Sequence, residues 1–211
     1  MEEKIQAVYE AVLHGAMADT TGLVQEALDA GIEADTILKE GLITAMSEIG
    51  QRFESGEAYV PEMLISAKSM KFGLELLRPL LVAADVQPIG KVIIGTIQGD
   101  LHDIGKNLVG MMMEGAGFEV IDLGVDVKPA QLLEAINEHK PDIVAMSALL
   151  TTTMGNMKSA IVEMEGAGVK DGLKVMIGGA AVTQDYADEI GADGFGIDAS
   201  QAATVAKKII S

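Results

Sequence analysis

The segment Gly99-Asp100-Leu101-His102-Asp103-Ile104-Gly105-Lys106-Asn107 contains a histidine in the connection between two expected elements of secondary structure. It follows an apolar run typical of a buried strand, at residues 92–97, and precedes a run with helical periodicity that ends at Gly115. His102 is therefore expected at the carboxyl end of a parallel strand, where ligands bind in open α/β sheets. Asp100 can hold one nitrogen of the imidazole ring while the other nitrogen faces a metal ion. The alternative is a histidine that caps a helix in an ordinary turn.

The two halves of the chain differ in the period of their apolar residues. Residues 1–85 have helical periodicity throughout, in four apolar stripes separated by glycine and proline, and the last stripe ends near Pro79. Four helices with short connections predict a small bundle. Residues 82–90 have the composition of a short linker and are expected to act as a hinge.

Beyond this linker, strand-like and helix-like segments alternate, as in a doubly wound parallel sheet. The expected strands are 91–97, 118–123, 142–147, 173–177 and 193–197, and the expected helices are 105–116, 129–139, 154–166, 183–190 and 199–210. Five strands favour the flavodoxin-like order, with the ligand site at the switch point beside the first strand. We therefore expect two domains, a helical bundle over residues 1–85 and an α/β domain over residues 86–211.

Composition excludes several classes of function. The formal net charge is −17 and no basic cluster occurs, so nucleic acid is not an expected partner. Cysteine is absent, which excludes disulfides, thiolate–zinc sites and cysteine nucleophiles. The sequence has no apolar run of about 18 residues and no signal-peptide pattern at its start, so we expect a cytoplasmic protein without a membrane partner.

The string Asp-x-His-x-x-Gly, from Asp100 to Gly105, resembles the cobalamin-binding motif of methionine synthase, of methylmalonyl-CoA mutase and of the corrinoid proteins of anaerobic methyl transfer. The resemblance implies a Rossmann-like cobalamin domain in which the loop histidine replaces the nucleotide base of the cofactor as the lower ligand to cobalt. His102 is implied to be that ligand, with Asp100 as its partner. The residues of this loop implied to contact the cofactor are Gly99, Asp100, His102, Asp103, Ile104 and Gly105.

A hydroxyl-rich segment after the third expected strand is similar to the same family. Its residues match the family pattern Ser-x-Leu-x-Thr followed by a further hydroxyl, and they are Ser147, Leu149, Thr151 and Thr153. In the family the first two hydroxyls face the displaced nucleotide tail, and the last one extends the relay behind the ligand. The resemblance thus implies a proton-coupled chain of His102, Asp100 and Thr153, in which Asp100 and Thr153 serve catalysis. A threonine-rich cap of the next helix is the alternative.

Gly178-Gly179-Ala180, after the fourth expected strand, matches the Gly-Gly that lines the slot for the buried nucleotide in this family. Two glycines also allow a flat ligand group to lie against the backbone. The alternative is a simple turn, which glycine pairs form in many proteins.

The helical half resembles the cap that covers the methyl-bearing face of the cofactor in methionine synthase and in anaerobic corrinoid proteins. Residues 50–63 carry its signature, G-x-x-F-x-x-G-x-x-F/Y-x-P, and residues 66–71 continue it. This cap is implied to shield the cobalt–carbon bond between transfers. Tyr59 and Met63 are the expected shielding side chains, and the alternative places both in the core of the bundle.

Taken together, the resemblance implies a corrinoid methyl carrier that is not an enzyme by itself. Its cofactor would be cobalamin, present as methylcobalamin in the loaded state. The implied partners are a substrate-specific methyltransferase, an acceptor methyltransferase of the thiol or tetrahydrofolate type, and a reductive activator. A cobalamin-dependent mutase subunit and a cobalamin-based sensor are the alternatives. The methyl donor is left open among methanol, methylamine, methylthiol and aromatic methyl ethers.

Overall fold

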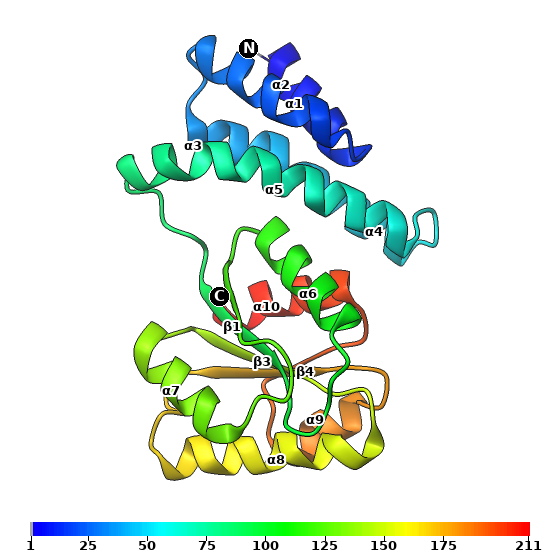
Figure 1. Cartoon of the computed structure of the whole chain (residues 1–211), viewed down its shortest axis with the longest axis vertical. Coiled ribbons are helices and arrows are strands. Elements are labelled where there is room, and N and C mark those ends of the chain that lie inside the picture. The colour runs from blue at the N-terminus through cyan, green and yellow to red at the C-terminus, as the bar shows by residue number, and fades with distance from the viewer. Residues whose placement is uncertain (1) are drawn as a thin grey trace. The chain divides into compact units, whose positions relative to one another are not determined.

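A computed structural model of the chain describes residues 2–211. The chain divides into two compact units (Figure 1). Residues 1–88 with 115–117 form the first, called here the helical unit, and residues 89–114 with 118–211 form the second, called the sheet unit. The expected domain boundary between residues 85 and 86 stays a prediction.

The helical unit is built from four helical rods, as predicted. Three of its segments follow one another without a break and form a single rod from residue 34 to residue 54, in which the middle segment is a π-helix. The elements are α1 Glu2–Leu13, α2 Met17–Asp29, α3 Ala34–Thr36, η1 Ile37–Ile43, α4 Thr44–Glu54 and α5 Val60–Ala83. The apolar stripes are buried, with Val8, Leu42, Met63 and Leu77 fully so.

The predicted end of the last rod near Pro79 is wrong, because α5 continues through this residue to Ala83. Proline in a helix interior removes one backbone hydrogen bond, at a cost of about 3 kcal/mol. Leu77 and Leu81 are buried on either side of Pro79. Burial of these side chains favours continuation of the helix, and residues 82 and 83 of the predicted linker are therefore helical.

The sheet unit contains five parallel strands in the order β2-β1-β3-β4-β5, which confirms the predicted flavodoxin-like topology. The strands are β1 Lys91–Thr96, β2 Glu119–Asp122, β3 Ile143–Ser147, β4 Lys174–Gly178 and β5 Gly194–Gly196. In the register of the sheet, Thr96 pairs with Ser147, Ser147 with Gly178, and Gly178 with Gly196. The loops after β1, β3, β4 and β5 therefore leave the sheet at the same level.

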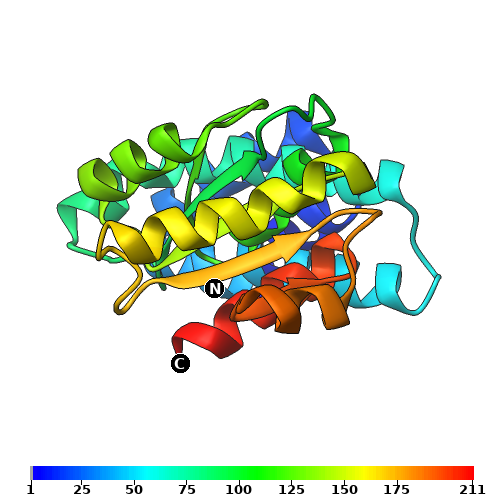
Figure 2. The ribbon, with the colours of Figure 1, turned by 90° about the horizontal axis from the view of Figure 1, so that it is seen from below.

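Helices cover both faces of this sheet. Figure 1 shows α6 Ile104–Gly115 and α10 Ala199–Ile210 on one face and α7 Pro129–His139 and α8 Thr151–Gly166 on the other. Figure 2 shows α8, in yellow, between α7 and α9 Gln184–Ile190. None of the helices between residues 2 and 211 is long and apolar enough to cross a membrane.

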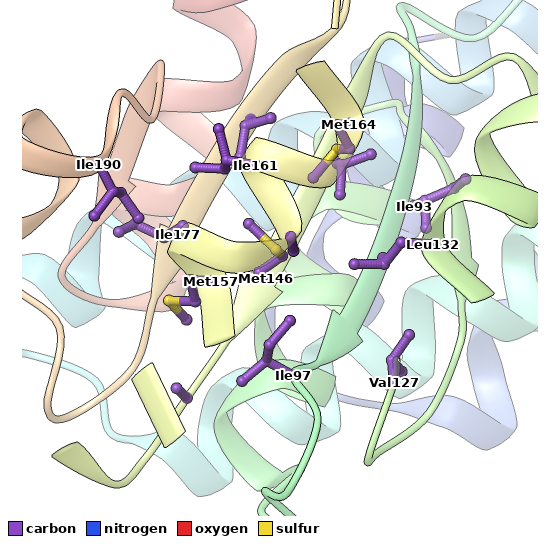
Figure 3. Packing of buried hydrophobic residues seen from close by; sticks show 14 of the residues in the cluster. Ile93, Ile97, Val127, Leu132, Met146, Met157, Ile161, Met164, Ile177 and Ile190 are labelled. Carbon is purple, nitrogen blue, oxygen red and sulfur yellow. The ribbon is translucent and has the colours of Figure 1, made fainter. Parts of the chain in front are cut away.

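The main core of the sheet unit lies between the strands and α7 and α8 (Figure 3). Met157, Ile161 and Met164 of α8 are buried against strand residues that include Ile93 and Met146. Each such side chain contributes about 1.5–3 kcal/mol when it is buried. This packing fixes α8, and with it the loop between β3 and α8, against the carboxyl end of β1.

Helix α8 begins at Thr151, whereas the sequence predicted a start at residue 154. Leu150 has the extended conformation of a residue that precedes a helix, and its carbonyl accepts a hydrogen bond from the N–H of Thr153 at 3.1 Å. The threonine run therefore forms the first turn of the helix rather than a loop before it.

Candidate functional site

The loop between β1 and α6 is organised around the carboxylate of Asp100. The residue is only 1% exposed, and both of its oxygens accept hydrogen bonds. Oδ1 accepts from the backbone N–H of His102 at 3.1 Å and lies 2.9 Å from its ring Nδ1. Oδ2 accepts from the hydroxyl of Thr153 at 2.8 Å and from the backbone N–H of Leu149 at 2.8 Å. One carboxylate thus connects the loop after β1 to the loop after β3.

These contacts keep Asp100 ionised. Burial by itself raises the pKa of the carboxyl, because the charged form loses hydration. Hydrogen bonds from the backbone N–H of His102, the Thr153 hydroxyl, the His102 ring and the backbone N–H of Leu149 favour the charged form. They outweigh burial and hold the pKa of Asp100 well below its usual range. The group is therefore an acceptor at neutral pH.

His102 is held at one ring nitrogen and presented at the other. An ionised carboxylate can only accept, so Nδ1 carries the proton that lies between it and Asp100. The imidazole side chain is 56% exposed, and no hydrogen bond to its Nε2 occurs among residues 2–211. In the neutral imidazole, Nε2 is then the nitrogen that is free to bind a metal ion, in the arrangement where a carboxylate behind a histidine sets its tautomer.

Thr153, in the first turn of α8, is 7% exposed and completes this group. Its Oγ1 lies 2.8 Å from Oδ2 of Asp100 and 3.0 Å from the carbonyl oxygen of Leu150. The structure therefore brings together the three residues of the expected relay. The single hydroxyl hydrogen can serve one of these acceptors at a time.

The other residues predicted after β3 lie on the same edge but outside this cluster. Ser147 ends the strand, and Leu149 contributes its backbone N–H to Asp100 while its side chain is 38% exposed. Thr151 is exposed at the start of α8, and no hydrogen bond of its hydroxyl occurs in the described part of the chain. The Ser147 hydroxyl likewise has no hydrogen bond among residues 2–211, so both hydroxyls can bind a ligand.

The glycines of the site differ in whether the fold itself requires a residue without a side chain. Gly179 has φ +124°, and a Cβ there would lie 2.0 Å from the carbonyl oxygen of Ala148, so close packing of two loops already requires glycine. Gly178 pairs with Gly196 in the sheet, and Ala180 is exposed beyond it. A Cβ at Gly105, in contrast, would meet no atom within 4 Å.

The remaining residues predicted in the β1–α6 loop shape its backbone. Gly99 has φ +84°, which glycine adopts without strain. Asp103 accepts a hydrogen bond from the side chain of Asn107 at 3.1 Å across the first turn of α6. Ile104 begins this helix and is 78% exposed.

Three contacts at the site involve residues that the sequence patterns did not single out. The buried hydroxyl of Thr96 donates to the carbonyl oxygen of His102 at 2.8 Å. Asp126 accepts from the N–H of Gly99 at 2.7 Å, although its own φ is +54°. Lys106, buried in α6, pairs with Asp122 at the end of β2 at 2.5 Å. A polar residue that ends an apolar strand is the one signal that would have indicated Thr96.

The edge of the sheet that carries His102 exposes several large apolar side chains. Loops after β1, β2, β3 and β5 expose large apolar side chains at this edge of the sheet, namely Leu101, Ile104, Val125, Leu149, Leu150 and Ile197. Leu101 and Ile197 are 72% and 70% exposed. Exposed apolar groups gathered at one place mark a binding surface in many proteins. The open space over Gly105 adds room for close approach.

The donor set fits a metal ion that arrives with most of its ligands. No group of three or more His, Asp or Glu side chains that could hold a metal ion occurs among residues 2–211. His102 therefore offers a single nitrogen. A metal held in a macrocycle needs only such an axial ligand from the protein. The residues present are thus compatible with a corrinoid, whose ring supplies the other donors.

Comparison with known proteins identifies the class. Residues 90–205 and residues 4–78 each match a family model described as a B12 binding domain. The chain therefore belongs to the B12-binding family, and its cofactor is cobalamin.

Within this class the chain is similar to corrinoid proteins of methyl transfer. It is 40% identical to the trimethylamine corrinoid protein of Methanosarcina barkeri, over 100% of this chain and 98% of the relative. The dimethylamine corrinoid protein of the same organism is 37% identical over 100% and 99% of the two chains. The structure resembles a chain of the methanol:cobalamin methyltransferase complex MtaBC of Methanosarcina barkeri, with a TM-score of 0.89, 30% identity and coverage of 100% of this chain and 80% of that one.

Proposed function

We propose that this chain carries a methyl group on cobalamin that is bound with its nucleotide base displaced and with Nε2 of His102 as the lower ligand. The carrier function is supported by the family and by the relatives described above. The arrangement of His102, Asp100 and Thr153 is the observation that carries the ligand assignment. Cobalt, when bound, supplies the chemistry of accepting and releasing the methyl group.

The residues of the chain supply orientation and a defined protonation state. Asp100 holds a proton of His102 on Nδ1, so that Nε2 is the nitrogen left free in the neutral imidazole. Because the pKa of Asp100 is held low, its carboxylate stays ionised and remains an acceptor for the hydrogen bond of Nδ1. Thr153 stabilises the ionised carboxylate through its hydroxyl. The exposed apolar side chains of Leu101 and Ile104 lie in the same loop and at the start of α6, and we assign them to contact with the cofactor.

The displaced nucleotide tail requires a separate part of the site. We assign it to the edge formed by Ser147, Thr151 and the Gly178-Gly179-Ala180 turn. Ser147 and Gly178 are paired in the sheet, so the two loops that follow them leave from adjacent positions. In the helical unit, Tyr59 is 68% exposed and Met63 is fully buried. Tyr59 is therefore the better candidate for the shield of the methyl group.

The partners follow from the same role. A carrier needs one methyltransferase that loads it and another that unloads it, and a reductive activator that restores the cobalt after accidental oxidation. The relatives named above are designated for trimethylamine, dimethylamine and methanol systems, so we propose a small methylated amine or alcohol as the donor class. Reduced holoprotein is mixed with each methyl donor together with its methyltransferase, and the change in absorbance identifies which donor loads the carrier.

The ligand assignment is tested on the full chain reconstituted with hydroxocobalamin and reduced to the cobalt(II) state. The EPR spectrum is expected to show coupling to one axial nitrogen, and this coupling changes from a triplet to a doublet when the protein is labelled with ¹⁵N-histidine. His102→Ala is expected to lose the labelled nitrogen, and His139→Ala, at the end of α7, to keep it. If the spectrum ignores the histidine label, or if the pigment leaves the protein on a desalting column, the assignment is wrong.

A further inference from the structure

His102 is held at its backbone as well as at its ring. Its N–H donates to Oδ1 of Asp100 at 3.1 Å, and its carbonyl oxygen accepts from Oγ1 of Thr96 at 2.8 Å. No other hydrogen bond to this carbonyl occurs in residues 2–211. Asp100 and Thr96 therefore fix the two ends of the residue whose Nε2 is presented to the metal.

Thr96 is itself immobilised by the sheet. It is the last residue of β1 and is fully buried. Its backbone N–H donates to the carbonyl of Gly124 at 3.0 Å, and its own carbonyl accepts from the N–H of Val127 at 2.9 Å. It also pairs with Ser147 of β3 in the register of the sheet. The residue is thus anchored on both sides, by the loop after β2 and by β3.

The side chain of Thr96 connects the fixed end of β1 to the loop that carries His102. A β-branched side chain has few rotamers, so the hydroxyl of a fixed threonine points in one direction. Since the residue is fully buried, solvent cannot take the place of its hydroxyl without rearrangement. This hydrogen bond joins residues six positions apart and therefore connects the end of β1 to the far side of the β1–α6 loop.

We propose that Thr96 is a positioning residue for the metal ligand: its hydroxyl fixes the backbone of His102, and the imidazole thereby keeps one orientation toward cobalt. This inference rests on the proposed role of His102 as the lower ligand. Thr96 acts through the backbone carbonyl of His102, and it affects how completely the histidine coordinates.

The test compares Thr96→Ser with Thr96→Ala, because both variants lack the methyl group and differ only in the hydroxyl. Each full-length variant is loaded with hydroxocobalamin and reduced, and the fraction with a histidine nitrogen on cobalt is measured by EPR. We expect Thr96→Ser to resemble the wild type. Thr96→Ala is expected to lower the ratio of histidine-bound to histidine-free cobalt about fivefold, the worth of one net hydrogen bond.

Thr20→Val is the matched control. Thr20 is also fully buried and its hydroxyl is also hydrogen-bonded, to Ser69 at 2.6 Å, but it lies in the helical unit. Loss of the Thr20 hydroxyl is expected to lower the melting temperature without a change in the fraction of cobalt that is bound by histidine. If Thr96 only stabilises the fold, Thr96→Ala will also lower the melting temperature and leave the histidine-bound fraction unchanged. That result would overturn the proposal.

The outcomes separate the two proposals. If His102→Ala leaves the EPR spectrum of the wild type unchanged, the ligand assignment fails, and the role of Thr96 fails with it. If His102→Ala removes the nitrogen coupling but Thr96→Ala and Thr96→Ser give equal ratios, only the role of Thr96 fails. Should Thr96→Ala not fold at 25 °C, while Thr96→Ser folds with the wild-type ratio, the comparison is made with Thr96→Val, which keeps the shape of the side chain.

Discussion

Oδ1 of Asp100 binds His102 twice, through the backbone N–H at 3.1 Å and through ring Nδ1 at 2.9 Å. The two residues are separated by one position, so a single oxygen fixes both the turn of the loop and the rotation of the ring. The other oxygen is held by Thr153 and Leu149, which belong to a different strand connection. The orientation of the imidazole therefore depends on the alignment of β1 with β3.

Asp100→Asn is expected to weaken coordination by His102. An amide of the same shape can still accept from the backbone N–H, but it lacks the charge that keeps the proton on Nδ1. Substitution of such groups behind a metal ligand lowers metal affinity by about 10- to 100-fold. The histidine-bound fraction of cobalt(II), measured by EPR, is expected to fall accordingly. Asp193→Asn is the control, because Asp193 precedes β5 and accepts hydrogen bonds from Lys170 and Val175 rather than from His102. An equal loss in this variant would contradict the prediction.

Gly105→Ala and Gly179→Ala are expected to have opposite effects on the apoprotein. Gly105 lies in α6 with no atom within 4 Å of an added Cβ, so alanine leaves stability unchanged or raises it by up to about 1 kcal/mol. If cobalamin binds over this loop as proposed, the same Cβ occupies space beside it, so cobalamin affinity is expected to drop. At Gly179 the added Cβ would lie 2.0 Å from a backbone oxygen, and unfolding is expected before any effect on binding can be seen.

Thermal unfolding of the two apoproteins and equilibrium binding of hydroxocobalamin test this pair. Normal binding by a stable Gly105→Ala variant would show that no ligand group approaches this position. A stable Gly179→Ala variant would show that the loops after β3 and β4 can separate without cost.

Asp126→Ala is expected to destabilise the loop that carries His102. Asp126 accepts from the N–H of Gly99 at 2.7 Å and donates its own N–H to the carbonyl of Asp100 at 3.0 Å, with φ at +54°. Alanine loses the acceptor and adopts positive φ at greater cost, which together amount to about 1–3 kcal/mol. Asparagine keeps an acceptor and tolerates this conformation, so Asp126→Asn should remain close to the wild type in urea unfolding. Equal loss in both variants would mean that the charge, and not the backbone geometry, is what matters.

Asp193 is expected to make folding depend on pH. Burial raises its pKa, but hydrogen bonds from Lys170 and the N–H of Val175, with the charges of Lys170 and Lys174, lower it below its usual value. A carboxyl whose pKa is depressed in the folded state stabilises the fold above the unfolded pKa, about 3.9, and loses this contribution as pH falls through the folded pKa.

Asp193→Asn should therefore be less stable than the wild type at pH 7, by about 1 kcal/mol for a partly exposed pair. The difference should shrink steadily below pH 4, as the wild-type carboxyl becomes protonated. Melting temperatures measured from pH 3 to pH 7 check this, and a difference that stays constant over the range would exclude the ion pair as its cause.

Much of the fold could be predicted because its elements have strong periods. All five strands and the five helices of the sheet unit lie within a few residues of the predicted ranges, since alternation of buried strands and amphipathic helices is a local property. The wrong predictions concern the ends of helices. Pro79 lies inside α5 and Thr151 begins α8, because burial of neighbouring leucines and docking on the sheet outweigh local preference at these positions.

The site was predictable only where a short motif spans it. Asp100 and His102 are neighbours in the loop, so their contact follows from the chain. Thr153 lies 53 residues from Asp100, and only the family resemblance indicated that they meet. No sequence motif indicates the other three contacts of the site. They are hydrogen bonds and an ion pair between segments that only the fold brings together, and they involve Thr96, Asp126 and the pair of Lys106 with Asp122.

The order of apolar and polar residues along this chain by itself determined which segments are strands, which are helices, and which loop carries the imidazole. The tertiary structure decided which donors hold the carboxylate behind that imidazole, because the pairing of Thr96 with Ser147 brings two loops to one level at the edge of the sheet. Only there does the carboxylate of Asp100 find enough donors to remain charged while buried, and a charged carboxylate is the acceptor that holds Nδ1 of His102 in place.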